Sequence, residues 1–151
     1  MSDINITQNE ADLLFKMEKI RVDDTEWKLP SGGNRLEIPL TSKDKKESFL
    51  LDLSRGRLNI ERRKYQNRCR QSVIIARLDF GSPHQNPDGQ EVGVPHLHLY
   101  KEGYNDKWAY ALPSYAFTDL TDHSKVLNDF MKFCNITESP IFDKGINLWM
   151  I

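Results

Sequence analysis

The chain has 151 residues, of which 38% are hydrophobic and 28% charged, and its formal net charge is −1. This length matches one domain of common size with a core of its own, and the composition argues against a disordered or a membrane-spanning chain. The first residues lack the basic and apolar segments of a secretion signal, and two cysteines are too few for a disulfide framework. We therefore expect a single domain, residues 1–151, in a cytoplasmic protein that does not associate with a membrane.

Helical patterns lie near the two ends of the sequence. Thr7 and Glu10 fit a capping box, and apolar residues at helical spacing follow, so we expect a helix over residues 7–21 that buries Leu13, Leu14 and Met17. A second helix is expected over residues 122–134. The segment after it is rich in apolar side chains, which we expect to pack on the domain or on a protein partner. These side chains are Ile141, Phe142, Ile146, Leu148, Trp149 and Met150.

Between the two helical patterns the hydrophobic period changes to two, which is typical of β-strands. The predicted strands are 26–29, 36–40, 49–53, 58–60, 71–80, 96–100 and 108–112. Residues 71–80 are apolar on both faces, as in a central strand. The sequence thus predicts the α+β class, with a mostly antiparallel sheet of about six strands and one helix at each end.

The most informative motif is the run Pro-His-Leu-His-Leu-Tyr at residues 95–100. Alternation along a strand would turn the two leucines toward the core and leave His96, His98 and Tyr100 as an exposed strip on the other face. Two imidazoles and a phenol suit metal binding, proton transfer or contact with nucleic acid. The pattern alone does not choose among these.

A basic run precedes the central strand. Between residues 55 and 70 the chain carries seven basic residues and one acidic residue, Glu61, and an aromatic side chain stands among them. Such a run suits phosphate contact and base stacking. The residues predicted to bind nucleic acid are Arg57, Arg62, Arg63, Lys64, Tyr65, Arg68 and Arg70. An alternative is a solvated hairpin whose arginines pair with Glu61, Asp52 and other carboxylates.

Two kinds of catalysis fit the histidine motif. In metal-independent ribonuclease chemistry, His96 and His98 would act as base and acid, with Tyr100, Lys101 and nearby arginines beside the phosphate. For a metal site, His96, His98 and Glu102 partly match the first cupin motif, although the later histidine of that pattern is missing. The long loop 81–94 could fold over the strip and bring His84 to it. No cofactor is expected apart from this divalent metal.

Several blocks of the sequence together resemble a small bacterial family of unknown function. The blocks are residues 49–57, Tyr65, Arg68, 77–79, 86–89, 95–100, 102–104 and 106–110. The resemblance covers most of the chain and implies a bacterial domain of the kind carried on prophages and other mobile elements. It supplies no activity, so no catalytic residue can be transferred from it.

The leading functional hypothesis from the sequence is a nucleic-acid-interacting protein of a bacterial mobile element, toxin-like and with metal-independent ribonuclease activity. One alternative is a non-enzymatic module that binds protein, such as a phage- or plasmid-borne inhibitor. A second alternative is an enzyme with a histidine metal site. Whether the protein is an enzyme is left open at this stage.

Overall fold

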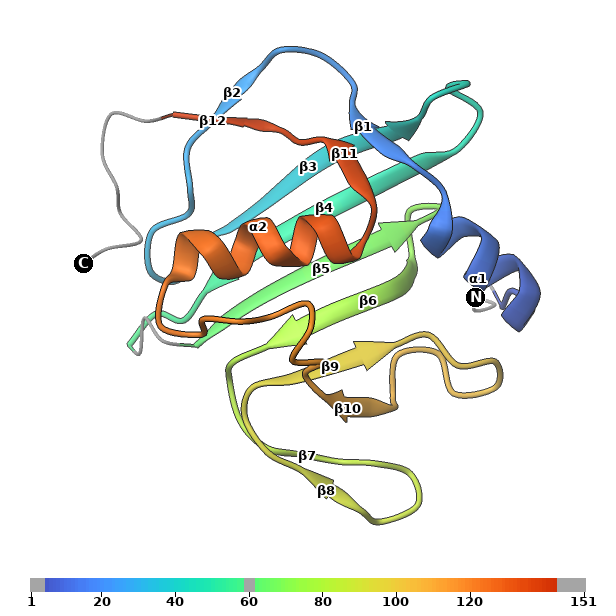
Figure 1. Ribbon diagram of the computed structural model, residues 1–151, viewed down its shortest axis with the longest axis vertical. Helices are drawn as coiled ribbons and strands as arrows, with labels where there is room; N and C mark the ends of the chain where they lie inside the picture. The colour runs from blue at the N-terminus through green and yellow to red at the C-terminus, as the bar shows by residue number, and fades with distance from the viewer. Residues whose placement is uncertain (1–4, 59–61, 144–151) are drawn as a thin grey trace.

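The computed structural model describes residues 5–58 and 62–143, which form two helices and twelve strands (Figure 1). The helices are α1 (Gln8–Lys16) and α2 (His123–Phe133). The strands of the main sheet are β1 (Lys19–Arg21), β3 (Arg35–Ser42), β4 (Ser48–Arg55), β5 (Arg63–Cys69), β6 (Val73–Asp79), β9 (His96–Leu99), β10 (Ala109–Ala111) and β11 (Ile136–Glu138). Two small sheets pair β2 (Glu26–Trp27) with β12 (Ile141–Phe142), and β7 (His84–Gln85) with β8 (Glu91–Val92).

The main sheet has the strand order β10-β9-β6-β5-β4-β3-β1-β11. Its neighbouring strands are antiparallel except for β1 and β11, which pair in parallel. The predicted α+β class is therefore confirmed. The sheet has eight strands instead of about six, because β1 and β11 are too short to show an alternating pattern and β5 lies within the basic run.

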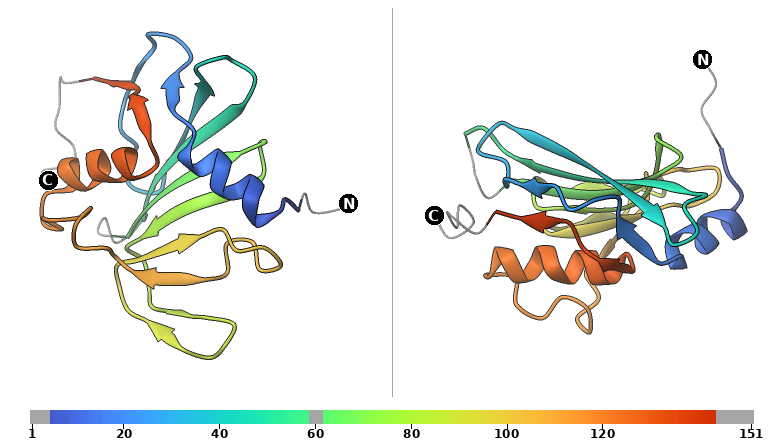
Figure 2. Two further views of the ribbon diagram at one scale, coloured as in Figure 1. Left: turned by 45° about the vertical axis from the view of Figure 1, so that its right-hand side comes forward. Right: turned by 90° about the horizontal axis from the view of Figure 1, so that it is seen from above.

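Both helices lie on the same face of the main sheet, as Figure 2 shows when the molecule is seen from above. On this face the buried side chains of β4, Phe49, Leu51 and Leu53, form one core with the apolar side of α2. Phe130 of α2 packs against Tyr65 of β5, with ring centroids 6.1 Å apart. No helix of the described residues covers the opposite face, so the polar half of each strand is directed there.

The helix boundaries follow from local chemistry. Thr7 and Glu10 form the predicted capping box, and Asp122 caps α2 by accepting from the amide of Lys125. The first helix ends at Lys16 and not at residue 21, because the chain turns there into β1. Leu14 is buried as predicted, but Leu13 is 65% exposed. Successive helix residues are about 100° apart, so only one of these two neighbours can face the sheet.

A buried lysine joins the ends of both helices. The Lys19 side chain is fully buried, and its ammonium donates to the carbonyls of Phe15 (2.8 Å), Met17 (3.0 Å) and Cys134 (2.6 Å). The carbonyl-rich C-terminal ends of helices attract cations. These three bonds offset much of the cost of taking the charge out of water. Sequence analysis did not anticipate this contact.

Two predictions concern the segment after β4 and the apolar tail of the chain. The first needs correction, and part of the second lies outside the described residues. Leu58 was expected to begin the strand 58–60, but it lies in a bend and is 98% exposed, and residues 59 and 60 lie outside the described residues. The antiparallel partners of β4 are β3 and β5. Ile141 and Phe142 form β12, while the other apolar residues of the tail lie outside the described residues. Across the described chain, neither helix has the length and apolarity needed to cross a membrane.

The adjacent pair on α1 gives a matched test of this packing. We expect Leu14→Ala to lower the free energy of unfolding by about 2–4 kcal/mol, because it removes buried methyl groups and leaves a cavity. Leu13→Ala should change it by less than about 0.5 kcal/mol, because that side chain is in water. Urea denaturation followed by circular dichroism measures both. Equal losses in the two variants would contradict the orientation of α1.

Candidate metal centre

The pairing of β6 with β9 brings four polar side chains together on the helix-free face. Asp79 is the cross-strand partner of His96, and Arg77 is the partner of His98. The alternation was predicted correctly, since Leu97 points into the core. The exposure was predicted wrongly, because His96 and His98 are each only 1% exposed.

The hairpin formed by β7 and β8 brings a third imidazole to these histidines. The ring centroid of His84 lies 4.6 Å from that of His98 and 5.8 Å from that of His96. Asn86 attaches the hairpin to β10 by donating to the carbonyl of Ala109 (2.9 Å) and accepting from its amide (2.8 Å). The segment 81–94 is thus an ordered hairpin, which Figure 1 shows beside β9 and β10.

The two buried imidazoles have the same hydrogen-bond arrangement. Nδ1 of His96 bonds the carbonyl of Gly93 (3.0 Å), and Nδ1 of His98 bonds the carbonyl of Asp106 (2.7 Å). A carbonyl only accepts, so each Nδ1 carries the hydrogen and each neutral ring keeps its lone pair on Nε2. Nε2 of His96 is buried and has no hydrogen-bond partner in the described part of the chain. Metal-binding histidines typically bond a carbonyl through the nitrogen that does not bind the metal.

Asp79 supplies a carboxylate to the same place. Its Oδ1 accepts from the amide of Gly81 (2.6 Å), while its Oδ2 lies 3.8 Å from Nε2 of His96. Asp79, His96 and His98 can each offer one ligand atom, and these atoms lie within 4.8 Å of one another. Tetrahedral zinc with bonds of about 2.0–2.1 Å needs ligand atoms ~3.3 Å apart. Small side-chain movements would therefore suffice to gather the three around an ion.

The surroundings keep His98 uncharged at neutral pH. Burial, and next the nearby Arg77 guanidinium, lower the pKa of His98 from its usual 6.5 to about 4. Arg77 in turn forms an ion pair with Asp106 (2.5 Å). A neutral imidazole can bind a metal, whereas a protonated one cannot.

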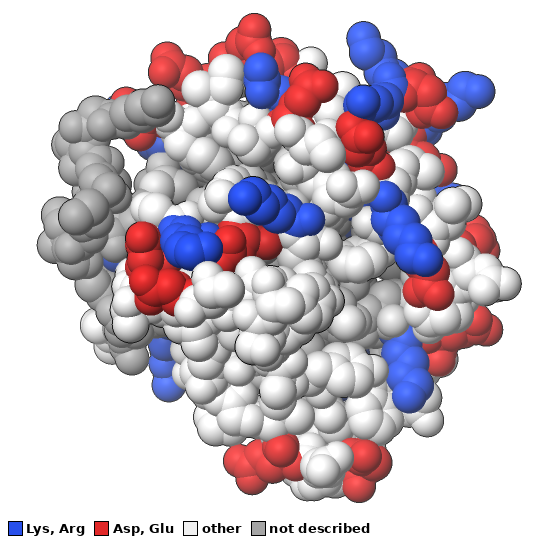
Figure 3. Space-filling view, viewed as in Figure 1, with Lys and Arg blue, Asp and Glu red and all other residues white. Residues whose placement is uncertain are grey.

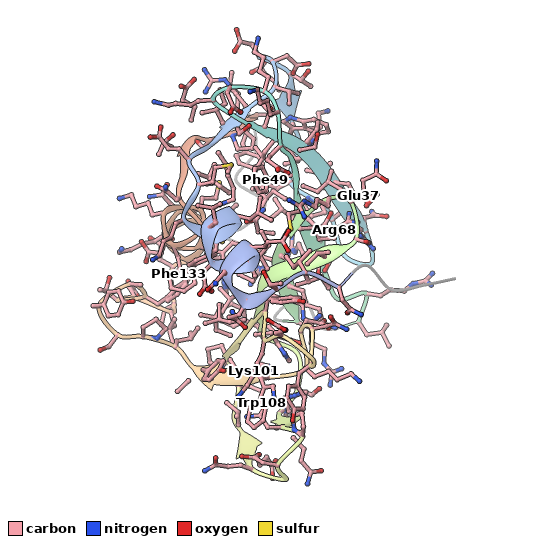
Figure 4. The ribbon with its side chains drawn as sticks, turned by 90° about the vertical axis from the view of Figure 1, so that its right-hand side faces the viewer. Glu37, Phe49, Arg68, Lys101, Trp108 and Phe133 are labelled. Atoms are coloured by element: carbon pink, nitrogen blue, oxygen red, sulfur yellow. The ribbon has the colours of Figure 1, made fainter. Side chains whose placement is uncertain are left out.

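Three residues that were predicted to lie beside the histidines make contacts in other parts of the molecule. They follow Leu99, where β9 ends. The hydroxyl of Tyr100 donates to the carbonyl of Ile6 (2.6 Å). The ammonium of Lys101 lies 4.3 Å from the centre of the Trp108 ring, and Figure 4 shows the two side by side. The carboxylate of Glu102 accepts from the first amide of α1 (2.7 Å). The carboxylate beside the two histidines therefore comes from Asp79 and not from Glu102 as predicted.

The basic run is divided between the two faces of the sheet. Arg63 and Tyr65 point toward α2 and are 1% and 0% exposed, so the Tyr65 ring cannot stack on a base as predicted. Lys64 and Arg68 point to the helix-free face. Strand β6 separates β5 from β9, so the basic strand does not pair directly with the histidine strand.

The arginines at the end of this run, Arg68 and Arg70, form ion pairs with carboxylates. Arg68 donates to Asp52 (2.6 Å) and to Glu37 (2.7 Å), and Figure 4 shows it turned toward Glu37. Arg70 pairs with Glu10 (3.0 Å) and Glu47 (3.5 Å). Arg57 and Arg62 are exposed. On the face seen in Figure 3, the lysines and arginines of the described residues stand among acidic side chains and form no continuous basic patch.

Comparison with known proteins assigns the chain to a family. A model of the family DUF6978, a family of unknown function, matches residues 6–136. The chain belongs to DUF6978. This confirms the resemblance to an uncharacterised family. No curated protein and no solved structure matches the chain significantly.

Asp79 is the residue of this DUF6978 chain that sequence reasoning missed as a candidate ligand. It ends the apolar strand β6, two positions after Arg77, so its side chain shares a face with that arginine. This spacing marks a polar face at the end of the strand. The partner strand and its register, which bring His96 opposite, are not encoded in any local pattern.

The lowered pKa of His98 predicts how stability depends on pH in metal-free protein. Between pH 6.5 and 4 the unfolded chain binds a proton that folded His98 rejects. The free energy of unfolding should fall as the pH drops through this window, by ~2 kcal/mol once solvent screening is allowed for. Urea denaturation with a chelator present, at several pH values, measures it. His98→Gln should flatten this part of the profile, and an unchanged profile would contradict the assignment.

Proposed function

We propose that this protein binds a divalent transition-metal ion, Zn²⁺ first among them, through Asp79, His96 and His98. The observation that carries the proposal is Nε2 of His96, a nitrogen that is buried without a hydrogen-bond partner in the described chain. A buried polar atom left unpaired is costly, and a bound ion would remove that cost.

The donor set fits a transition metal better than Mg²⁺ or Ca²⁺, which prefer oxygen ligands. Two imidazole nitrogens and one carboxylate oxygen are ligands found in zinc sites and also in non-haem Fe²⁺ sites. The carbonyl bonds of both Nδ1 atoms support the proposal further, because they fix each ring with Nε2 available. Affinity for Zn²⁺ is expected to exceed that for Fe²⁺.

The nucleic-acid hypothesis stays a prediction, and the contacts described above favour the metal site over it. A general acid or base must reach a proton of the substrate, and both histidines are almost fully buried. His98, with a pKa of about 4, carries too little proton at neutral pH to act as a general acid. The predicted phosphate-binding Arg68 is held by two carboxylates.

Zinc binding to purified, chelator-treated protein tests the proposal. Isothermal titration calorimetry and metal analysis should give one Zn²⁺ per chain. A concentration 100 times the dissociation constant should stabilise the fold by about 2.7 kcal/mol. His96→Ala and His98→Ala should weaken binding at least as much as the loss of an outer-shell partner does, by roughly 10–100-fold.

His123→Ala is the matched control, because this histidine lies at the start of α2 and bonds Arg63. It should leave zinc affinity unchanged. Wild-type protein that takes up no zinc, or equal losses in all three variants, would overturn the proposal. Incubation with bulk RNA, with and without EDTA, distinguishes the metal site from the ribonuclease hypothesis. Cleavage that persists in EDTA and requires His96 would favour the metal-independent ribonuclease.

A further inference from the structure

Three ligands leave one position of a tetrahedral ion to be filled, and the nearest further imidazole belongs to His84. We propose that His84 is the fourth ligand, so that the ion closes its own site and fastens the β7–β8 hairpin to the main sheet. This inference rests on the metal binding proposed above. It concerns the coordination number and the role of the hairpin.

The hydrogen bond of His84 leaves the nitrogen that this role requires. Its Nε2 bonds the carbonyl of Lys107 (2.7 Å), so Nε2 carries the hydrogen and the lone pair of the neutral ring is on Nδ1. Each of the three imidazoles thus has one nitrogen bound to a backbone carbonyl and the other available. The three carbonyls come from separate residues, Gly93, Asp106 and Lys107. This is the outer-shell arrangement that orients histidine ligands.

The three rings are also in mutual contact. His96 and His98 have ring centroids 4.8 Å apart, and the His84 ring lies against both. His84 is not part of the group whose ligand atoms already lie within 4.8 Å of one another. Its ring must therefore move inward when an ion binds.

The attachment of the hairpin allows such a movement. β7 and β8 form a sheet of their own and are not hydrogen-bonded strands of the main sheet. Two contacts connect this hairpin to the rest of the molecule. Asn86 bonds Ala109 of β10, and His84 bonds the carbonyl of Lys107. A Cβ added at Gly93 would meet no atom within 4 Å, so the backbone at this end of the hairpin is not tightly enclosed.

The coordination number decides the chemistry of the centre. Zinc with four protein ligands is typical of structural sites, whereas zinc with three keeps a water that can act as a nucleophile. With His84 bound, the ion would hold segment 84–92 in place and exclude water. The proposal therefore assigns the centre a clamping role instead of hydrolysis.

Cobalt-substituted protein gives a direct readout, because tetrahedral Co²⁺ has intense visible absorption that responds to each ligand. We compare wild type, His84→Ala, His84→Gln and the control His123→Ala, each loaded with Co²⁺ and titrated with azide. In wild type and the control, azide should leave the spectrum unchanged. In the His84 variants the open position should accept azide and shift the spectrum, and affinity for Zn²⁺ should fall roughly 10–100-fold.

Hydrogen exchange measured by mass spectrometry adds a readout of the clamp. Zinc should slow exchange of residues 84–92 in wild type and not in the His84 variants. Wild-type protein that binds no Co²⁺ or Zn²⁺ refutes the proposed function itself. Metal binding with unchanged affinity in both His84 variants, or an azide shift already in wild type, refutes only the role of His84. His84→Gln keeps a polar side chain, so the test stands if His84→Ala fails to fold.

Discussion

The pairing register of β6 with β9 is the constraint on which the centre depends. It sets Asp79 opposite His96 and Arg77 opposite His98, and it sends Leu78 and Leu97 into the core. Because side chains alternate along a strand, a slip of one residue would exchange the two faces. The leucines would then meet the hairpin, and the imidazoles would enter an apolar core without partners. The energy of burying the leucines therefore also fixes the geometry of the polar cluster.

Sequence patterns predicted the parts of the fold that local chemistry determines. The capping box at Thr7, the start of the second helix near residue 122 and the alternation of β3 and β4 were all correct, because each depends on neighbours within a few residues. The short strand β1 was missed, because three residues show no period. The extent of α1 was also wrong, since the chain leaves the helix after Lys16 and continues into β1.

The histidine motif shows where sequence reasoning about a site ends. Alternation placed His96 and His98 on the correct face, but burial depends on what covers that face. The cover is a hairpin formed by residues 81–94, for which the sequence indicated a long loop that could fold over the strip. Likewise, β5 alternates as any strand does, yet a run of like charges gave no sign that Arg63 would be buried. The pairing of Arg68 with Asp52 agrees with the alternative interpretation of the run, in which carboxylates pair with its arginines.

The Asn86 contact also affects whether another chain can pair with the edge of the main sheet. β10 is the last strand of the main sheet, so its outer backbone groups could in principle pair with another chain. The Asn86 amide satisfies both the N–H and the C=O of Ala109, as a neighbouring strand would. One side chain thus occupies the position where a foreign strand would begin to add. The same contact that positions the hairpin also protects this edge of the sheet against aggregation.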